Sequence, residues 1–552
     1  MSDQKRVYGI DLGTTYSCIA SVDDSGRPTV YANSQGDLTT PSVVYFESET
    51  SIVVGQDAKD VAALHPELVV SMVKRCMGNA DWKYDHAGQS YRPEQISAFI
   101  LRKVVQDAEV TAGAKIEDVV ITCPAYFGVN QKEATKQAGK LAGLNVLTVI
   151  PEPTAAAIAF GLQQKDNQAV LVYDLGGGTF DVTAITIEKN AITVIATDGN
   201  HQLGGGNWDD QIVNHFASSF ELATGTPSDE LLKDADTYQA LLLAAEKCKK
   251  ALSAKTSVKQ PVQHGTEKII VELTREKFDE ITRHLLDETI TILKRVLEAS
   301  KDKKLTKFDK VLLVGGSTYM PQVQQRVKLE MPCEVLQTDP NQIVAKGAAM
   351  YGLKCEIDIR IQEALEASGA DPDSAAGQEQ RKKVLKQLAG QTNVPEQVLT
   401  QLADKEVTNV SSKSFGVAAL DDANTKKIFN LVCVDDQVPA APTQNFVTSV
   451  DRQISVDLDI YENVSRLRGD DAAIDLHSGT LIGKLVVGFD RPLPRGTPIQ
   501  VAFTLDRDGL LSVIAREATT GRKAETTIKT GSVMDENQLN QATSQDMKKK
   551  VS

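Results

Sequence analysis

Two short stretches of the chain share one pattern, in which an apolar strand runs into an aspartate and a glycine-containing turn with threonine. The first is GIDLGTTYS at residues 9–17, and the second is DLGGGTFDVT at residues 174–183. Three consecutive glycines weaken any strand or helix, because glycine loses the most conformational entropy on ordering. Bare backbone at residues 176–178 therefore indicates that another group approaches the chain closely there. The repeat favours two lobes that face one site.

A third glycine turn, VGGSTYMP at residues 314–321, follows another apolar strand. Three such turns are typical of a nucleotide held between two lobes by backbone N–H groups, and the glycines let the main chain reach the phosphates. Thr15 and Thr179 can donate hydrogen bonds to phosphate oxygens, while Asp11 and Asp174 lie at strand ends, where they can hold Mg²⁺ through its water shell. Any one turn alone could be an ordinary end of a strand. The repetition favours a phosphate site.

Length and periodicity predict the architecture of the first two thirds of the chain. The 552 residues exceed what one hydrophobic core holds, which predicts two to four domains. Residues 1–355 alternate short apolar runs with stretches of helical spacing, which predicts an α/β region with ligand loops at the strand ends. The expected buried strands are 119–122, 169–175 and 310–316, and the expected helices are 94–112, 131–143, 238–253 and 276–299.

The pattern changes after residue 355. Residues 356–407 are charged and helical in spacing, and we expect a helical insert and a linker there. Residues 408–532 alternate apolar and polar side chains, which predicts an antiparallel β domain with a hairpin turn at Asp508-Gly509. Residues 533–552 lack the apolar periodicity to pack alone, so we expect a helical stub or a disordered tail.

Charge and cysteine usage exclude several classes of protein. The net charge of −14 argues against a protein that coats nucleic acid, which would present a basic face. Seven cysteines without a CxxC pair favour a reducing compartment over a disulfide framework or a zinc site. We find no apolar signal core at the N-terminus and no uninterrupted apolar run of membrane-spanning length. We therefore expect a cytoplasmic protein that binds neither nucleic acid nor a membrane.

Five motifs, in the same order as in the family, resemble the 70-kDa heat-shock chaperones, the DnaK-like proteins. They are IDLGTTYS, CPAYFGVNQKEATKQAGKLAGL, PEPTAAAIAFGL, YDLGGGTFDVT and VGGSTYMPQVQ, and they lie within residues 1–355. Residues 408–532 resemble the family's peptide-binding domain more loosely, through GTLIGKLVVGF, LPRG and DRDGLLSVIARE. The resemblance implies an ATPase domain with duplicated actin-like or sugar-kinase-like lobes, followed by an antiparallel β-sandwich. It also implies an ATP-dependent chaperone that hydrolyses ATP slowly.

Residues that match the family's motifs carry implied catalytic roles. Three aspartates match the carboxylates that organise Mg²⁺ and the attacking water, a lysine matches the contact to the γ-phosphate, a glutamate matches the acid that orients water, and a threonine matches a phosphate ligand. These residues are Asp11, Asp174 and Asp181, then Lys74, Glu152 and Thr179. The implied reaction is in-line attack of water on the γ-phosphate of ATP, helped mainly by positioning and charge neutralisation.

The resemblance places the other nucleotide-binding residues on the glycine turns and on the helix with the sequence EKCKKALS, which would hold the adenosine. They are Gly13, Thr14, Thr15, Tyr16, Gly176, Gly177, Gly178, Gly204, Gly205, Glu246, Lys249, Lys250, Ser253, Gly315, Gly316, Ser317, Tyr319 and Asp339. Two positions depart from the family. Tyr319 stands where an arginine usually stacks on adenine, and Gly206 replaces a glutamate that usually contacts the ribose. Tyrosine can also stack, so we expect nucleotide binding to survive.

The segment between the domains departs further. The family joins its domains by a short acidic and leucine-like linker that docks on the ATPase domain, whereas residues 403–414 read ADKEVTNVSSKS. Docking would lose apolar anchors, each worth roughly 1.5–3 kcal/mol when fully buried. The resemblance implies a J-domain co-chaperone and a nucleotide exchange factor as partners. Thr148, Pro151 and Lys132 depart from the pattern that such a J-domain engages.

The β domain carries the expected site for an extended, unfolded polypeptide segment. Val456 aligns with the centre of the family's peptide pocket, and the full expected set is Val417, Leu420, Phe446, Val456, Leu458 and Phe489. Such a groove binds an extended chain by backbone hydrogen bonds, with one apolar side chain in the pocket. The same alternation also fits an ordinary sandwich core. With only a stub of the family's helical lid, we expect peptides to exchange faster.

Two other functions fit parts of the pattern. A nucleotide-binding co-chaperone or scaffold that hydrolyses ATP weakly or not at all would explain the altered linker and the missing lid. A sugar or metabolite kinase could share the fold, but the β domain and the PEPTAAAIAF motif argue against it.

Overall fold

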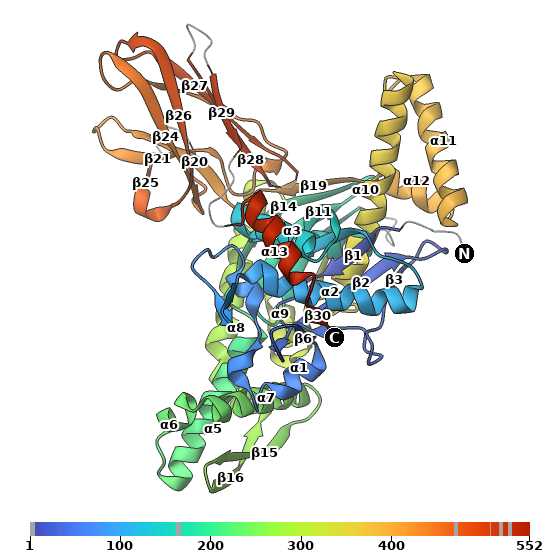
Figure 1. Ribbon diagram of the computed structural model, residues 1–552, viewed down its shortest axis with the longest axis vertical. Helices are drawn as coiled ribbons and strands as arrows, with labels where there is room; N and C mark the ends of the chain where they lie inside the picture. The colour runs from blue at the N-terminus through green and yellow to red at the C-terminus, as the bar shows by residue number, and fades with distance from the viewer. Residues whose placement is uncertain (1–5, 162–166, 469–472, 508, 518–522, 528–532) are drawn as a thin grey trace.

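The computed structural model describes residues 6–161, 167–468, 473–507, 509–517, 523–527 and 533–552. Two lobes of an α/β region form the body of the molecule, and a β region and a helical insert extend from opposite sides of it (Figure 1). The β region comprises the strands between residues 414 and 527, and the helical insert comprises residues 356–404.

The first lobe is built around a twisted sheet in the order β11-β10-β1-β2-β3. Its strands are β1 (Tyr8–Asp11), β2 (Tyr16–Val22), β3 (Pro28–Val30), β10 (Asp118–Cys123) and β11 (Asn145–Pro151). The helices α2 (Pro93–Ala112) and α3 (Val129–Leu141) pack against each other and bury their apolar faces in this lobe. A smaller sheet contains β5 (Val44–Phe46), β6 (Ser51–Val54) and β7 (Val69–Val70), and α1 (Gln56–Val61) packs beside it.

The second lobe repeats the topology of the first. Its sheet runs β18-β17-β12-β13-β14, and in both lobes an antiparallel three-stranded meander is extended by two parallel strands. These strands are β12 (Gln168–Leu175), β13 (Phe180–Ile187), β14 (Ala191–Asn200), β17 (Lys310–Val314) and β18 (Glu334–Gln337). The other elements are α5 (Gly205–Thr224), α6 (Ser228–Lys233), α7 (Ala235–Leu252), β15 (Ser257–His264), β16 (Glu267–Thr274), α8 (Arg275–Asp302) and α9 (Pro321–Glu330). The repeated glycine turns in the sequence therefore correspond to a repeated fold.

One apolar core joins the two lobes. The alanine-rich helix α4 (Glu152–Gly161) packs against α10 (Ile343–Ser368), and both helices bury side chains in a cluster that includes residues from both sheets. Small side chains allow this close crossing, because a Cβ at Gly347 would lie only 1.7 Å from the Ala155 carbonyl oxygen. The predicted class, an α/β region followed by antiparallel sheets, is confirmed.

The helical insert is anchored in this core. Helix α10 continues without a break through the predicted boundary at residue 355, so that boundary does not coincide with the end of an element. It is followed by α11 (Ala375–Thr392) and α12 (Glu396–Asp404), which fold back beside it. Leu388, Leu399 and Leu402 are buried in the same cluster as α4 and α10. The insert is therefore fixed to the α/β region.

The linker docks on the α/β region, although it lacks the leucine-like residues of the family's linker. In strand β19 (Glu406–Val410), residues 406–408 pair in parallel with β14, and residues 409–410 pair antiparallel with β22 (Gln437–Val438), so both short strands extend the sheet of the second lobe. The backbone hydrogen bond from Glu406 N to Asn190 O, at 2.7 Å, begins this pairing. Backbone pairing thus replaces the large apolar anchors.

The β region consists of two antiparallel sheets that enclose one apolar cluster. One sheet runs β25-β21-β20-β24-β26 and the other runs β23-β27-β28-β29. Their strands are β20 (Ser414–Leu420), β21 (Lys426–Val432), β23 (Thr443–Val447), β24 (Gln453–Asn463), β25 (Ile474–Asp475), β26 (Thr480–Leu493), β27 (Pro498–Leu505), β28 (Leu511–Glu517) and β29 (Lys523–Thr527). The expected hairpin joins β27 to β28; Asp508 of its turn lies outside the described residues.

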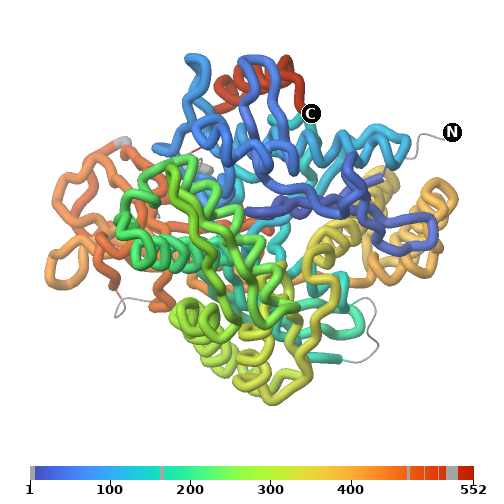
Figure 2. Tube along the Cα trace, turned by 90° about the horizontal axis from the view of Figure 1, so that it is seen from below, coloured from blue at the N-terminus to red at the C-terminus, as the bar shows by residue number. Residues whose placement is uncertain are grey.

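Residues 533–552 contain a helix and pack against the first lobe, although their sequence lacks the apolar periodicity that is typical of a packed segment. Helix α13 (Glu536–Asp546) contacts α3, and β30 (Lys550–Val551) adds a parallel strand to β6. Figure 2 shows this segment in red beside the blue first lobe. Met534, Ala542 and Val551 are buried in the core of that lobe.

The insert's anchoring predicts a stability effect. We expect Leu399→Ala to destabilise the α/β region by about 2–5 kcal/mol, because it leaves a cavity in a core that joins both sheets. Urea unfolding followed by tryptophan fluorescence measures the effect. Gln397→Ala, on the exposed face of the same helix, is the control. Equal unfolding curves for the two variants would contradict the anchoring.

Candidate functional site

A cavity of about 890 Å³ lies between the two lobes. The turns that follow β1, β12 and β17 meet on its floor, as the three glycine motifs predict. Helix α7 and the 3₁₀ turn Val73–Cys76 form parts of its walls. Equivalent strand ends of the two repeated lobes therefore face the same cavity.

The glycines after β12 are required by the turn of the opposite lobe. A Cβ at Gly177 would lie 2.2 Å from Thr15 Oγ1, and a Cβ at Gly178 would lie 2.2 Å from Thr14 Cγ2. Gly204 is equally close, since its Cβ would lie 2.5 Å from Gly178 N. The sequence predicted a close approach at residues 176–178, and the group that approaches in the structure is the threonine turn of the first lobe.

The third turn closes around Asp174. Gly315 has a φ of 83°, and its Cβ would lie 2.7 Å from Asp174 Oδ1. The Ser317 hydroxyl donates to Gly176 O at 2.8 Å, which ties the third turn to the second. These contacts leave Asp174 only 6% exposed, at the point where the three turns converge.

A buried ion pair lies beside these turns. Lys74 forms a hydrogen-bonded ion pair with Glu152, the first residue of α4, and the two side chains are 4% and 9% exposed. Asp11 lies close enough to influence both groups and accepts a hydrogen bond from Thr122 Oγ1 at 3.1 Å. Four of the six predicted catalytic and metal residues, Asp174 included, thus come together here.

The electrostatics of this centre favour an added cation. Burial raises the pKa of Asp11 to about 7, and the Glu152 carboxylate adds to this effect. Burial and Glu152 likewise raise the pKa of Asp181 to about 8 and hold that of Asp174 well above its usual range. Burial alone would lower the pKa of Lys74, but the Glu152 and Asp11 carboxylates raise it. Four carboxyl groups share one ammonium, so an added cation would favour the ionised form of the three aspartates and lower their raised pKa values.

The carboxyl groups do not form a direct cage for a metal. Within the described part of the chain, no three His, Cys, Asp or Glu side chains lie close enough together to ligate one ion. The group farthest from the cavity is Asp181, whose Oδ1 accepts a hydrogen bond from Tyr126 N at 3.2 Å. This arrangement suits a divalent cation that keeps most of its water shell, as Mg²⁺ usually does in proteins.

Charged residues also bridge the lobes at the outer end of the cavity. Lys59 of the first lobe lies 2.5 Å from Glu246 of the second, and Lys250 lies 2.8 Å from the same carboxylate. Both ammonium groups also donate to the Tyr16 hydroxyl, at 3.0 and 2.8 Å. Burial would raise the pKa of Glu246, but Lys59 and Lys250 overcome it and hold the pKa at about 2.

Sequence reasoning missed Arg75, which connects the lobes at the inner end. Its Nε donates to Gly178 O at 2.8 Å and its Nη2 donates to Asn207 Oδ1 at 2.6 Å. Asp209 was also missed; it pairs with Lys249 at 2.6 Å. The adjacent Lys74 gave the only local signal for Arg75, because the partners of Arg75 lie in the other lobe.

The structure places most of the predicted nucleotide residues on the cavity wall. Those that line it are Asp11, Gly13, Thr14, Thr15, Tyr16, Lys74, Glu152, Asp174, Gly176, Gly177, Thr179, Glu246, Lys249, Lys250, Ser253, Gly315, Gly316, Ser317 and Tyr319. Gly178, Asp181, Gly204, Gly205 and Asp339 lie outside the lining. Of these, Gly178, Gly204 and Gly205 pack behind the turns, and Asp339 pairs with Lys346 at 2.6 Å.

The predicted peptide-binding residues separate into three groups. Val417 and Leu458 are buried in the core of the β region. Phe446, Val456 and Phe489 are only partly buried and pack against that core. Leu420 is 46% exposed, at the end of β20. The three half-buried residues and Leu420 are therefore the members of the set that keep exposed surface, whereas Val417 and Leu458 belong to the core.

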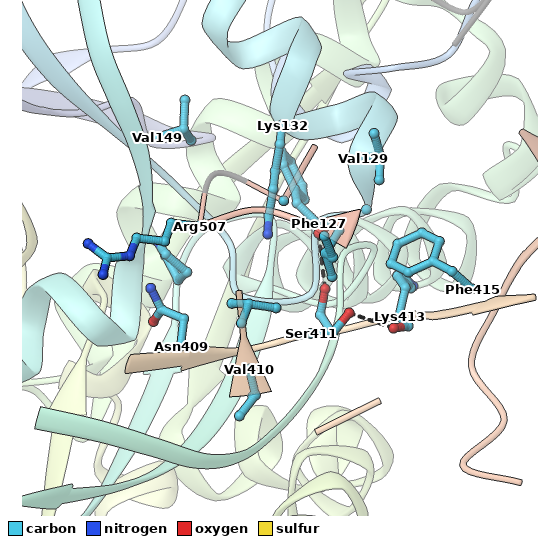
Figure 3. Close-up of a pocket in the computed structure, with 16 residues that line it drawn as sticks. Phe127, Val129, Lys132, Val149, Asn409, Val410, Ser411, Lys413, Phe415 and Arg507 are labelled. Carbon is cyan, nitrogen blue, oxygen red and sulfur yellow. Dashed lines mark hydrogen bonds between the residues drawn. The ribbon is translucent and has the colours of Figure 1, made fainter. Parts of the chain in front are cut away.

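A second, much smaller cavity lies where the α/β region meets the β region. Figure 3 shows Lys132 pointing from α3 toward Val410 and Ser411 of the linker. The volume of about 20 Å³ is close to that of one water molecule. This is a packed interface between regions rather than a ligand site.

The sequence matches a known family over most of its length. A family profile described as "Hsp70 protein" matches residues 7–362 and 388–552. The chain belongs to the Hsp70 family. Members of this family bind ATP and ADP with Mg²⁺, are ATPases, and act as chaperones that bind substrate peptides and co-chaperones. The unmatched residues 363–387 fall in the helical insert, at the end of α10 and in α11.

None of the helices in the described ranges is both long enough and apolar enough to cross a membrane.

The bridge at Glu246 predicts a pH-dependent stability difference. Because the folded pKa is depressed to about 2 from 4.5, the stabilisation by Lys59 and Lys250 is present above pH 4.5 and is lost as the pH falls toward 2. We expect Glu246→Gln to lower stability at pH 7, on the order of 2–3 kcal/mol, with a difference that shrinks below pH 4. Thermal unfolding between pH 2 and 7 measures it.

Glu280→Gln, on the exposed surface of α8, controls for the loss of one carboxylate. A difference between Glu246→Gln and wild type that stays constant from pH 7 to pH 2 would rule out the bridge as its cause.

Proposed function

We propose that this chain is an ATP-dependent chaperone of the Hsp70 type, which hydrolyses ATP slowly in the interlobe cavity and binds extended hydrophobic peptide segments in the β region. The observation that carries the proposal is the buried Lys74–Glu152 pair beside Asp11 and Asp174, at the point where three glycine turns converge. If the Lys74–Glu152 pair served only to stabilise the fold, there would be no reason for equivalent strand ends of both lobes to converge beside it.

The chain's own groups can hold the nucleotide. The backbone N–H groups of the glycine turns and the hydroxyls of Thr14, Thr15 and Thr179 would bind the phosphates. The outer wall around Glu246 and Tyr319 would hold the adenosine. Asp11, Asp174 and Asp181 would hold Mg²⁺ through its water shell, and that ion would neutralise phosphate charge.

Hydrolysis would depend on positioning. Lys74 would neutralise charge on the γ-phosphate, and its ion pair keeps the Glu152 carboxylate fixed at the start of α4. From there the carboxylate can accept a hydrogen bond from water and orient it for in-line attack. Thr179, which follows the glycine turn, would hold the phosphate opposite.

The β region would supply the peptide site. Val456 on β24 would lie at its centre, and Phe446 and Phe489, which like Val456 are half-buried against the core, would line it; the peptide would be an extended apolar segment. A J-domain co-chaperone and a nucleotide exchange factor are the partners that we propose from the family. The seven cysteines, all within the described residues, are free thiols, which supports a reducing compartment such as the cytoplasm.

Single-turnover hydrolysis tests the proposed ATPase. We expect Asp174→Asn and Thr179→Ala each to lower the rate at least 100-fold, because each removes a group aimed at the phosphates or their cation. Phosphate release from pre-bound ATP is the readout, and Asp229→Asn, on the exposed helix α6, is the control. Hydrolysis at the wild-type rate in both site variants would overturn the mechanism. ATP binding without any hydrolysis in wild type would favour the scaffold alternative.

The peptide site is tested by filling it. We expect Val456→Phe to weaken binding of a labelled hydrophobic peptide at least tenfold, because the larger ring would fill space at the half-buried position that we propose for the peptide side chain. Val486→Phe makes the same change on the outer face of β26, where Val486 is 60% exposed, and should leave binding unchanged. Fluorescence anisotropy in ADP measures both. Equal affinities would argue that Val456 belongs only to the core.

A further inference from the structure

The first lobe has an edge strand that is covered by a distant part of the same chain. Residues 533–552, which we call the C-terminal latch, pair with β6 through three backbone hydrogen bonds. Lys550 N donates to Thr50 O at 2.8 Å, Ser552 N donates to Ile52 O at 3.0 Å, and Val54 N donates to Ser552 O at 2.9 Å. This is strand addition to an open sheet edge, a common way in which proteins bind extended peptides.

The latch also fills apolar space on the first lobe. Val551 is 8% exposed and belongs to the same cluster as Ile52 and Val54. Met534, which precedes α13, and Ala542, which lies on it, are buried in that cluster too. Burying these side chains supplies affinity that three hydrogen bonds on an exposed edge would lack.

Polar side chains of the first lobe are matched to the latch backbone. The Gln137 amide donates to Met534 O at 2.8 Å and accepts from Met534 N at 3.1 Å. The Arg102 guanidinium donates to Asp546 O at 2.7 Å and to Lys549 O at 2.9 Å, which satisfies carbonyls at the end of α13. Gln95 donates to the Asp546 carboxylate at 2.9 Å, and that side chain is only 1% exposed. The first lobe therefore carries a built site for this segment.

The opposite end of the β region is anchored to the second lobe. Strand β19 pairs with β14, and Lys405 Nζ donates to Glu188 O at 2.8 Å. The Thr154 hydroxyl donates to Asn409 Oδ1 at 2.8 Å. Helix α12 ends at Asp404, two residues before β19, and its Leu399 and Leu402 are buried in the core. The linker therefore has no slack with which to leave the sheet.

Contacts between these two anchors complete the attachment. The Glu462 carboxylate of β24 lies at the N-terminus of α3, where it accepts from Val129 N at 3.4 Å. A Cβ at Gly128 would lie 2.5 Å from Glu462 Oε1, so glycine permits this approach. Thr197 N of β14 donates to the Asp435 carboxylate at 3.0 Å. Each contact is favoured because the anchors keep its partners at high effective concentration.

We propose that the C-terminal latch binds the β6 edge of the first lobe and, together with the insert-anchored strand β19, holds the β region against the α/β region in solution whether or not nucleotide is bound. The inference goes beyond the proposed activity and does not depend on it. The ligand of the β6 edge is an extended segment of this same chain.

Hydrogen exchange on the full chain tests the latch. In wild type we expect the Val54 and Glu406 amides to exchange at least 100-fold more slowly than free peptide without nucleotide, with ADP and with ATP, and to differ less than threefold among these states. Val551→Asp places a charge in the buried position and should speed exchange at Val54 at least tenfold. Lys550→Asp puts the same charge on the exposed side of β30 and should leave it unchanged.

Arg102→Met provides a second test that leaves the latch sequence intact, and it should speed exchange at Val54 in the same direction. The Val172 amide in the central strand β12 reports whether each variant remains folded. Unchanged exchange at Val54 in both Val551→Asp and Arg102→Met would overturn the latch. Tenfold faster exchange at Val54 or Glu406 in any one nucleotide state of wild type would overturn the permanent attachment. Neither result depends on whether ATP is hydrolysed.

Discussion

Thr14 and Thr15 of the first lobe press directly against the bare backbone of Gly177 and Gly178 in the second. This contact fixes the distance between the two sheets, because a single added Cβ on either glycine would force the turns apart. The buried charge centre depends on it: Lys74 and Asp11 come from the first lobe, and Asp174 from the second. The relative position of the lobes therefore decides whether these groups act together.

The properties of this site depend less on any single side chain than on how the two lobes place several charged groups together. Burial raises the pKa of the carboxyl groups of Asp11, Asp174 and Asp181. The nearby Lys74 ammonium opposes this effect, and a bound cation would oppose it further. The bridge from Lys59 to Glu246 also joins the lobes at this cavity, and it too is largely shielded from solvent, with the two side chains 16% and 19% exposed. One end of the cavity thus carries carboxyl groups whose pKa is raised, and the other carries a carboxylate, Glu246, whose pKa is lowered by two lysines.

The sequence allowed the repeated lobes, the strands and helices of the α/β region and most of the cavity wall to be predicted, because strand–Asp–Gly turns are local patterns. The docking of the linker was missed, since its pairing with β14 at residues 406–408 and with β22 at residues 409–410 uses backbone groups and leaves no side-chain period. The latch was missed because Met534, Ala542 and Val551 are too widely spaced to show a period. Arg75 was missed because its partners, Gly178 and Asn207, lie more than a hundred residues away.

The position of α3 has a consequence for the order in which the protein can be completed. This helix follows β10 in the first lobe, yet its N-terminus meets Glu462 and its flank meets α13. A chain that emerges from the ribosome from its N-terminus therefore presents the β6 edge and the flank of α3 uncovered until residues 533–552 have been made. During synthesis, the β6 edge of the first lobe therefore remains open to strand addition by other chains until the end of the chain has been made, although the lobe's sheet is translated early.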